Sequence, residues 1–248
     1  MRIAKKDLQL KVFRRREVQS LTAADKLKRL NACKRLKKCM TRNKVSRTWF
    51  SDEKIFTVET PSNSQNDRVY ASVRTKRDVS PSRLLKPRKH FTKSVMVSVA
   101  VSKFGKTSLV FMESGAKVNS AYYFDSVLKN GLLPDIRRLS GNNFTFQRSH
   151  RSKHTVSFLQ INVSNFIEPP NWPPNSPDLN PVDYSIWGAL QQLVYRQKIE
   201  NIDHLKQVVN SCWDMISQEL IDGAIEQRSK RLSSVVRSRG GHIEHRFS

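Results

Sequence analysis

The sequence predicts an α/β fold, a mixed sheet flanked by helices, with a basic helical arm in front of it. Three strand-like segments, at 49–58, 94–102 and 107–113, come first and have no long helical pattern between them. Shorter strand-like segments then alternate with helical patterns up to residue 168. Consecutive strands commonly pair antiparallel, whereas strands separated by helices pair parallel. We therefore expect one sheet that contains both kinds of pairing.

The charge of the chain is its most unusual property. It has 248 residues, enough for a buried core, with 38% hydrophobic residues and a formal net charge of +24. Such a chain is expected to bind a polyanion, first of all nucleic acid and second an anionic membrane surface. The sequence contains no apolar run of bilayer-spanning length, and no apolar core follows the basic N-terminus, so we expect no membrane partner. The three cysteines lack metal-ligand spacing and are expected to be free thiols in a reducing compartment.

Residues 1–48 form the predicted basic arm. They carry 17 Lys and Arg against 3 Asp and Glu, a net charge of +14, and the other 200 residues carry +10. Thr22 and Asp25 have the spacing of a capping box at a helix start. The apolar residues that follow recur every three or four positions to about residue 40: Leu27, Leu30, Cys33, Leu36 and Met40. This helix either packs on the domain by that stripe or contacts DNA, and periodicity alone leaves both interpretations open.

The first strand, residues 49–58, has bulky apolar residues around a polar Ser-Asp-Glu-Lys centre. A buried carboxylate is costly unless it is paired or bound to a metal. Asp52 is therefore either at an exposed strand end or part of a site, and Glu53 should point to the opposite face of the strand. Residues 60–92 predict a long loop with a short strand near 68–71. Its basic residues either contact phosphates or form a solvated face.

The middle of the chain supplies the rest of the sheet. Residues 94–102 are Val-rich and predict a buried strand, a turn follows at 104–106, and 107–113 return as a strand. A helix is expected from about 119 to Pro134. Further segments are expected as a strand, a helix and a strand, at 143–147, around 156–159, and at 165–168.

Residues 171–188 contain four prolines, three of them close together, so this stretch must begin as a stiff extended loop. Asn180 and Pro181 then read as the N-cap and first residue of a helix. The loop thus delivers Asp183 into a first helical turn, which is also an ordinary place for an aspartate. Two more helices are predicted at 202–216 and 218–235, and a disordered tail at 237–248.

Two of these stretches resemble the catalytic motifs of mariner-type (Tc1/mariner superfamily) DNA transposases. One reads Trp-Pro-Pro-Asn-Ser-Pro-Asp-Leu-Asn-Pro-Val-Asp-Tyr at 172–184, and the other reads Phe-Ser-Asp-Glu-Lys-Ile-Phe at 50–56. The resemblance implies an RNase H-like domain of the DDE type at 49–236. It also implies that the helix of the arm links this domain to DNA-reading helix-turn-helix modules that would precede the sequence.

The resemblance further implies a metal site. Asp52 and Asp183 would be two of three carboxylates that hold Mg²⁺ or Mn²⁺, ions that prefer oxygen ligands. The third acid belongs between Phe146-Gln147 and His154-Thr155, where this chain has Ser149. Residues 136–167 contain no carboxylate that could replace it. Zinc on His150 and His154 would lack a third ligand, and a Ser149–His150 nucleophile pair is disfavoured because adjacent residues seldom face each other.

The sequence thus favours a transposase-derived protein that binds double-stranded DNA and whose ancestral metal-dependent strand cleavage and transfer is impaired. A residual divalent-metal nuclease and a non-enzymatic RNA- or chromatin-binding protein are the alternatives. We expect a nuclear location and no small-molecule cofactor, and a homodimer is compatible with the resemblance. The candidate nucleic-acid contacts are basic residues: Arg14, Arg15, Arg16, Lys34, Arg35, Arg88, Lys89, Arg148, Arg151 and Lys153.

Overall fold

The computed structural model describes most of the chain. The described residues are 18–61, 69–73, 75–84, 92–112, 123–147, 153–163 and 165–247. Side chains at 76, 84, 153–155, 158 and 169 are not among them. Six strands are described: β1 (Thr48–Thr57), β2 (Ser94–Ser102), β3 (Gly105–Lys106), β4 (Val110–Met112), β5 (Thr145–Gln147) and β6 (Asn165–Ile167).

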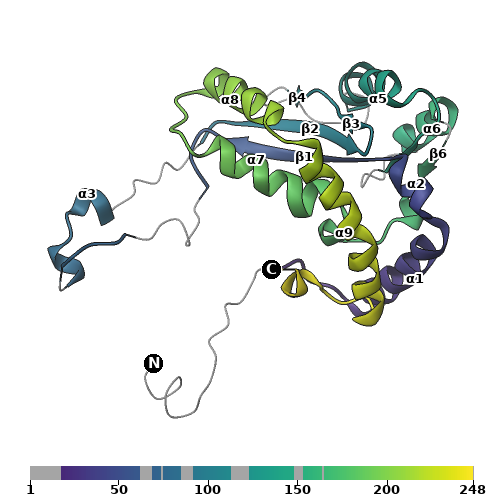
Figure 1. Ribbon diagram of the computed structural model, residues 1–248, viewed down its shortest axis with the longest axis horizontal. Coiled ribbons are helices and arrows are strands. Elements are labelled where there is room, and N and C mark those ends of the chain that lie inside the picture. Colours follow the sequence, from purple (N-terminus) through teal and green to yellow (C-terminus); the bar gives the residue numbers. More distant parts are fainter. Residues whose placement is uncertain are drawn as a thin grey trace, which may run out of the picture.

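Helices cover this sheet and follow it in the chain (Figure 1). The longer ones are α1 (Ala23–Cys39), η3 (Tyr123–Leu132), α5 (Leu133–Ser140), α6 (Lys153–Asn162), α7 (Trp187–Val194), α8 (Ile202–Asp214) and α9 (Gln218–Arg237). The shorter ones are α2 (Arg42–Ser46), η2 (Lys76–Asp78), α3 (Pro81–Leu84), η4 (Pro169–Asn171), η5 (Pro177–Leu179), η6 (Val182–Ile186) and η7 (Glu244–Arg246). No described helix combines the length and the apolar character needed to cross a membrane.

The sheet is mixed, as the sequence predicts. Its strands lie in the order β3-β2-β1-β5-β6, and β4 also pairs with β2. β1 and β2 are antiparallel, with Asp52 opposite Val99. β1, β5 and β6 are parallel to one another, and Phe50 lies opposite Gln147. The carboxyl ends of β1 and β5 therefore point the same way, which brings Asp52 toward the end of the sheet where the chain leaves β5.

Alternate residues of β1 face two different cores. Phe50 and Phe56 pack with α7, α8 and the start of α9. Trp49, on the other face, packs with η3, α5 and β5. Figure 1 shows α7 on one side of β1 and β2 and α5 on the other. Because side chains alternate along a strand, Asp52 shares the face of Phe50, and Glu53 shares the face of Trp49.

The capped helix of the arm is confirmed as α1, and its packing face differs from the predicted stripe. Thr22 and Asp25 form the expected capping box. Leu27, expected on the packed face, is 59% exposed, whereas Arg29 is fully buried together with Cys33 and Leu36. In Figure 1, α9 runs from the sheet to α1, and these helices pack together. The buried face of α1 is therefore centred on an arginine.

Several predicted elements end elsewhere in the structure. Pro134 does not end a helix: it lies in the first turn of α5, which continues directly from η3 to Ser140. Pro134 donates no hydrogen bond, and it lies where the π-helical η3 passes into α5, so the missing bond falls at the junction of the two helices. Residues 69–71 form no strand, and the return strand is broken around Thr107 into β3 and β4. Residues 238–247 were expected to be disordered, yet they fold over α1 and bury Ile243 completely.

Candidate functional site

Asp52 is held on β1 by a side chain from α7. The indole N–H of Trp187 donates to Asp52 Oδ2 at 2.7 Å. Trp187 is itself buried against Phe56, with the two rings edge to face at 6.0 Å. Trp187 and the apolar residues of β1 thus hold the carboxyl of Asp52 in a half-buried position.

Asp183 reaches the same place from the proline loop, residues 171–181. Asn180 caps the following helix as expected, because its Oδ1 accepts the N–H of Val182 at 3.2 Å. The same amide donates to the carbonyl of Ser51 at 3.1 Å, so the cap is tied to β1 beside Asp52. Asp183 then lies in η6, a single widened π-helical turn of a kind that is frequent at functional sites.

The carboxyl groups of Asp52 and Asp183, the acidic pair, lie within hydrogen-bond reach of each other. Burial and the negative charge of Asp52 raise the pKa of Asp183 to about 8. Burial, followed by the charge of Glu53, raises the pKa of Asp52 to about 6, while its hydrogen bonds to Trp187 and Asp183 oppose this rise. Two half-buried carboxyl groups this close cannot both ionise freely, so one proton is held between them.

Glu53 points to the opposite face of β1, as predicted. It accepts hydrogen bonds from Tyr123 and Ser98, on η3 and β2. These partners belong to the second core and to the strand that pairs with β1. Glu53 therefore does not join Asp52 and Asp183 as a third carboxylate of the site.

The chemistry of the acidic pair fits a divalent cation such as Mg²⁺ or Mn²⁺. Two carboxylates meet in a site where their mutual repulsion holds a proton, and a cation in place of that proton would relieve it. Within the described residues no group of three or more His, Cys, Asp or Glu side chains could hold a metal. The described part of the chain thus offers two carboxylate ligands, Asp52 and Asp183.

A cavity of about 490 Å³ opens beside Asp183. One of its walls is the proline loop, including Pro174 and Asn180, and another is the start of the arm helix with Asp25. The arm therefore helps to shape the approach to the acidic pair.

Most of the predicted nucleic-acid contacts lie in parts of the chain that the structure does not describe. Lys34 and Arg35 are exposed on α1. The other predicted residues lie outside the described part: Arg14, Arg15, Arg16, Arg88, Lys89, Arg148 and Arg151. Of Lys153 only the backbone is described. Ser149 and His150, like the side chain of His154, are also outside the described part.

A basic groove of about 730 Å³ lies where α1 and α2 meet the amino ends of β5 and β6. Four cationic side chains line it, and none of its described lining residues is acidic. Its floor includes Phe144 and Phe166. The four cations are Arg35, Lys38, Lys44 and Arg47. Of these four, only Arg35 was predicted from the sequence, and Lys44 and Arg47 join it through the packing of α2 beside α1.

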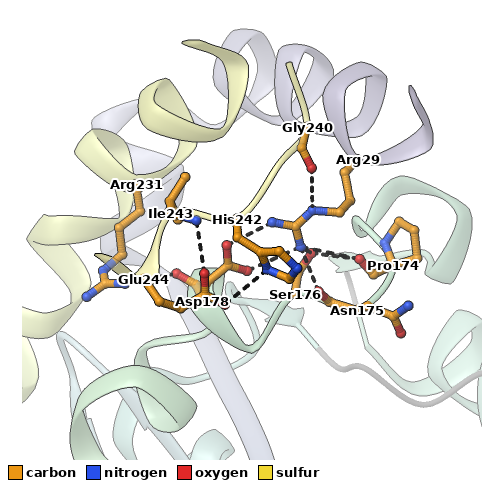
Figure 2. A network of polar contacts seen from close by, with 10 residues as sticks. All are labelled: Arg29, Pro174, Asn175, Ser176, Asp178, Arg231, Gly240, His242, Ile243 and Glu244. Carbon is orange, nitrogen blue, oxygen red and sulfur yellow. Dashed lines mark hydrogen bonds and ion pairs between the residues drawn. The ribbon is translucent and has the colours of Figure 1, made fainter. Parts of the chain in front are cut away.

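The sequence analysis also missed a buried ion pair next to the site. Arg29 of α1 and Asp178 of the proline loop are both almost completely buried, and Arg29 Nη2 lies 2.8 Å from Asp178 Oδ2 (Figure 2). Burial raises the pKa of the Asp178 carboxyl, and the hydrogen bonds from Arg29 oppose that rise. The spacing of Arg29 to Ala32, Cys33 and Leu36 on one helix face was the available signal.

Comparison with known proteins relates the chain to transposases. It is 30% identical to the Tc3 transposase of Caenorhabditis elegans over 236 residues, which cover 91% of this chain and 65% of that protein, just under two thirds. The Mos1 transposase paired-end complex with the left transposon end matches with a TM-score of 0.81 at 19% identity, over 96% of this chain and 69% of that one. The Mos1 mariner paired-end complex with Mn matches with a TM-score of 0.79 at 18% identity, over 98% and 75%.

No protein-family model matches the chain. The structural matches establish the fold, a mixed sheet flanked by helices that agrees with the predicted RNase H-like layout. The sequence match extends along most of the chain. The chain is thus similar in sequence to the Tc3 transposase and in fold to the Mos1 transposase.

Proposed function

We propose that the chain is a transposase-derived protein that binds double-stranded DNA and retains the remnant of a metal centre for cutting and joining DNA strands. The observation that carries this proposal is the meeting of Asp52 and Asp183, which lie far apart in the sequence and share a hydrogen bond in the fold. Relatives named as transposases support the same interpretation.

In the proposed centre, Asp52 and Asp183 would hold Mg²⁺ or Mn²⁺, the two metals present in solved Mos1 complexes. When bound, such an ion activates a water or a 3′-hydroxyl and stabilises the leaving oxygen. The residues of the chain orient the ligands. Trp187 fixes one oxygen of Asp52, and Asn180 ties the helix of Asp183 to β1.

We further propose that this activity is weakened, because Ser149 stands where the resemblance places the third carboxylate. Losing an anionic ligand removes attraction for the cation. Arg148 and Arg151 flank that position in sequence and add repulsion. One like-charge contact at about 4 Å costs about 1–4 kcal/mol between bulk-water and near-surface dielectric values.

The DNA-binding part of the proposal rests on charge. The net charge is +24, and the basic groove presents Arg35, Lys38, Lys44 and Arg47 without a described acidic neighbour. Double-stranded DNA is the proposed ligand. Because chromosomal DNA would supply that ligand, the nucleus is the proposed location. Each phosphate contact adds about −0.9 to the slope of log binding constant against log salt. Replacing Lys38, Lys44 and Arg47 with alanine should therefore make the slope shallower by up to about 2.7.

The cleavage part is tested by nicking of a supercoiled plasmid in Mn²⁺. We expect the natural chain to nick near background, and Ser149→Asp to raise Mn²⁺-dependent nicking at least tenfold. Adding Asp52→Asn to Ser149→Asp should return nicking to background. Strong nicking by the natural chain that Ser149→Asp leaves unchanged would contradict the weakened centre and indicate a residual nuclease. Preference for RNA over duplex DNA at several salt concentrations would contradict DNA as the ligand.

A further inference from the structure

A single buried arginine joins the basic arm to the loop that delivers Asp183. We propose that Arg29 is a positioning residue: its guanidinium fixes the proline loop from the arm helix, and thereby fixes Asp183 against Asp52. The proposal rests on the proposed function of the acidic pair. It assigns to the arm a role in building the metal site, beyond any contact that the arm makes with DNA.

The guanidinium of Arg29 is fully buried and has acceptors on nearly every side (Figure 2). Two of its nitrogens contact the two carboxylate oxygens of Asp178, at 2.8 and 3.2 Å. Its Nε donates to the carbonyl of Gly240 at 3.0 Å. Its Nη1 also contacts three consecutive residues of the proline loop: Pro174, Asn175 and Ser176.

These contacts fix the one turn of the loop that has unusual backbone geometry. Asn175 has a φ of +49°, in the left-handed region that non-glycine residues seldom adopt. The Arg29 Nη1 contact with the carbonyl of Asn175 is 2.7 Å long. The loop is thus held in its bend by a donor from another part of the chain. A lysine in place of Arg29 would keep the positive charge. It would lack the planar guanidinium, which reaches several acceptors at once.

The loop transmits this anchor to the acidic pair over a short stretch of backbone. Asp178 lies in the 3₁₀ turn η5, which ends at the cap residue Asn180. Asn180 bonds both Ser51, next to Asp52, and the first turn of η6 that carries Asp183. The backbone carbonyl of Asp178 is held in addition by Arg231 of α9, at 3.2 Å. Every segment between Arg29 and Asp183 is therefore tied to a neighbouring element.

The cavity beside Asp183 gives independent support. Gln19 and Asp25, from the arm, line it together with Pro174, Asn175 and Asp183. If the arm helix moved away from the loop, the cavity would lose one wall and the loop would lose its anchor. The arm and the loop that carries Asp183 are therefore joined through Arg29 and enclose one cavity.

The experiment compares Arg29→Lys and Asp178→Asn with Leu36→Ala. Leu36 lies on the same buried face of α1 but packs against apolar residues and makes no contact with the guanidinium among the described interactions. Leu36→Ala thus loosens the arm while leaving the arginine in place. Two properties are measured where all variants are folded: Mn²⁺ affinity by electron paramagnetic resonance, and hydrogen exchange of the amides of Val182 and Tyr184.

We expect Arg29→Lys and Asp178→Asn to weaken Mn²⁺ binding about tenfold or more, the usual effect of losing a group that orients a metal ligand. Exchange at Val182 and Tyr184 should accelerate in both, and by more than in Leu36→Ala at a similar loss of stability, since Leu36 touches the loop only through apolar packing. Equal exchange in Arg29→Lys and Leu36→Ala would overturn the proposal. If the natural chain binds no Mn²⁺, the proposed metal centre fails, and the exchange measurement alone decides the role of Arg29.

Discussion

The indole N–H of Trp187 points at the carboxylate of Asp52, 2.7 Å from Oδ2. This hydrogen bond stabilises the ionised form of Asp52 and opposes the rise in its pKa that burial causes. The neutral indole thus stabilises the carboxylate of Asp52 without adding a positive charge that would repel a cation.

We predict that Trp187→Phe destabilises the chain most where Asp52 is ionised. A hydrogen bond contributes about 1.5–3 kcal/mol to a charged group and about 0.5–1.5 kcal/mol to a neutral one, so the loss should be larger at pH 8 than at pH 5 by about 1–1.5 kcal/mol. Trp213→Phe is the matched control, since Trp213 is also buried but donates to a neutral carbonyl, that of Thr107, at 2.8 Å. Urea unfolding at both pH values measures the difference. A pH-independent loss in Trp187→Phe would contradict the role of its N–H.

The raised pKa values of the acidic pair predict that the metal-free chain loses stability as pH rises. Between pH 4 and about pH 8 the folded state holds protons on Asp52 and Asp183 that the unfolded state has released. The unfolding free energy must then fall with pH, by up to about 1.4 kcal/mol per pH unit for each such proton. Urea unfolding with a chelator present measures this slope, and a slope equal to that of Asp183→Asn would show that the pair does not cause it.

Asp183→Asn should have opposite effects on the metal-free and metal-loaded chain. An amide need not ionise in a buried site, so at pH 8.5 the metal-free variant should be more stable by about 1–3 kcal/mol. The same variant should lose the thermal stabilisation that Mn²⁺ gives the natural chain. Asp214→Asn, on an exposed residue of α8, should change neither property. Thermal scans with and without Mn²⁺ decide this, and a less stable metal-free Asp183→Asn would count against mutual repulsion in the pair.

Gly240→Ala should be strongly destabilising. Gly240 has a φ of +83°, and an added Cβ would lie 1.9 Å from the carbonyl oxygen of Lys26. Strain and overlap together predict a loss of about 2–4 kcal/mol. Gly223→Ala, on an open face of α9 with nothing within 4 Å, should instead stabilise the chain by about 0.5–1 kcal/mol. Denaturant midpoints of the two variants test the contrast, and similar midpoints would mean that the close approach to α1 is not maintained in solution.

Local patterns in the sequence were enough to predict most of the sheet and the helix start that carries Asp183. The Val-rich run that became β2, and the Asn180-Pro181 helix start, depend on short-range chemistry that a sequence shows directly. The meeting of Asp52 and Asp183 followed from the resemblance of two motifs, because no periodicity connects segments so far apart.

The errors have a common physical cause. Helical periodicity places Leu27 inside and Arg29 outside, because it weighs residues by their own polarity. Arg29 is buried because acceptors from the proline loop and from residue 240 surround it, and those acceptors are invisible from within the helix. The tail was expected to be disordered from its composition for the same reason. Ile243 packs with Cys33 and Leu36, which lie at the other end of the chain.

The last residues of the chain close over its first described helix, through the carbonyl of Gly240 and the side chain of Ile243. A ribosome therefore releases the arm helix long before it releases the residues that complete the burial of Arg29. During synthesis the guanidinium of Arg29 therefore lacks this acceptor until residue 240 has been made. A premature stop or C-terminal trimming before residue 240 would leave the guanidinium of Arg29 permanently without this acceptor.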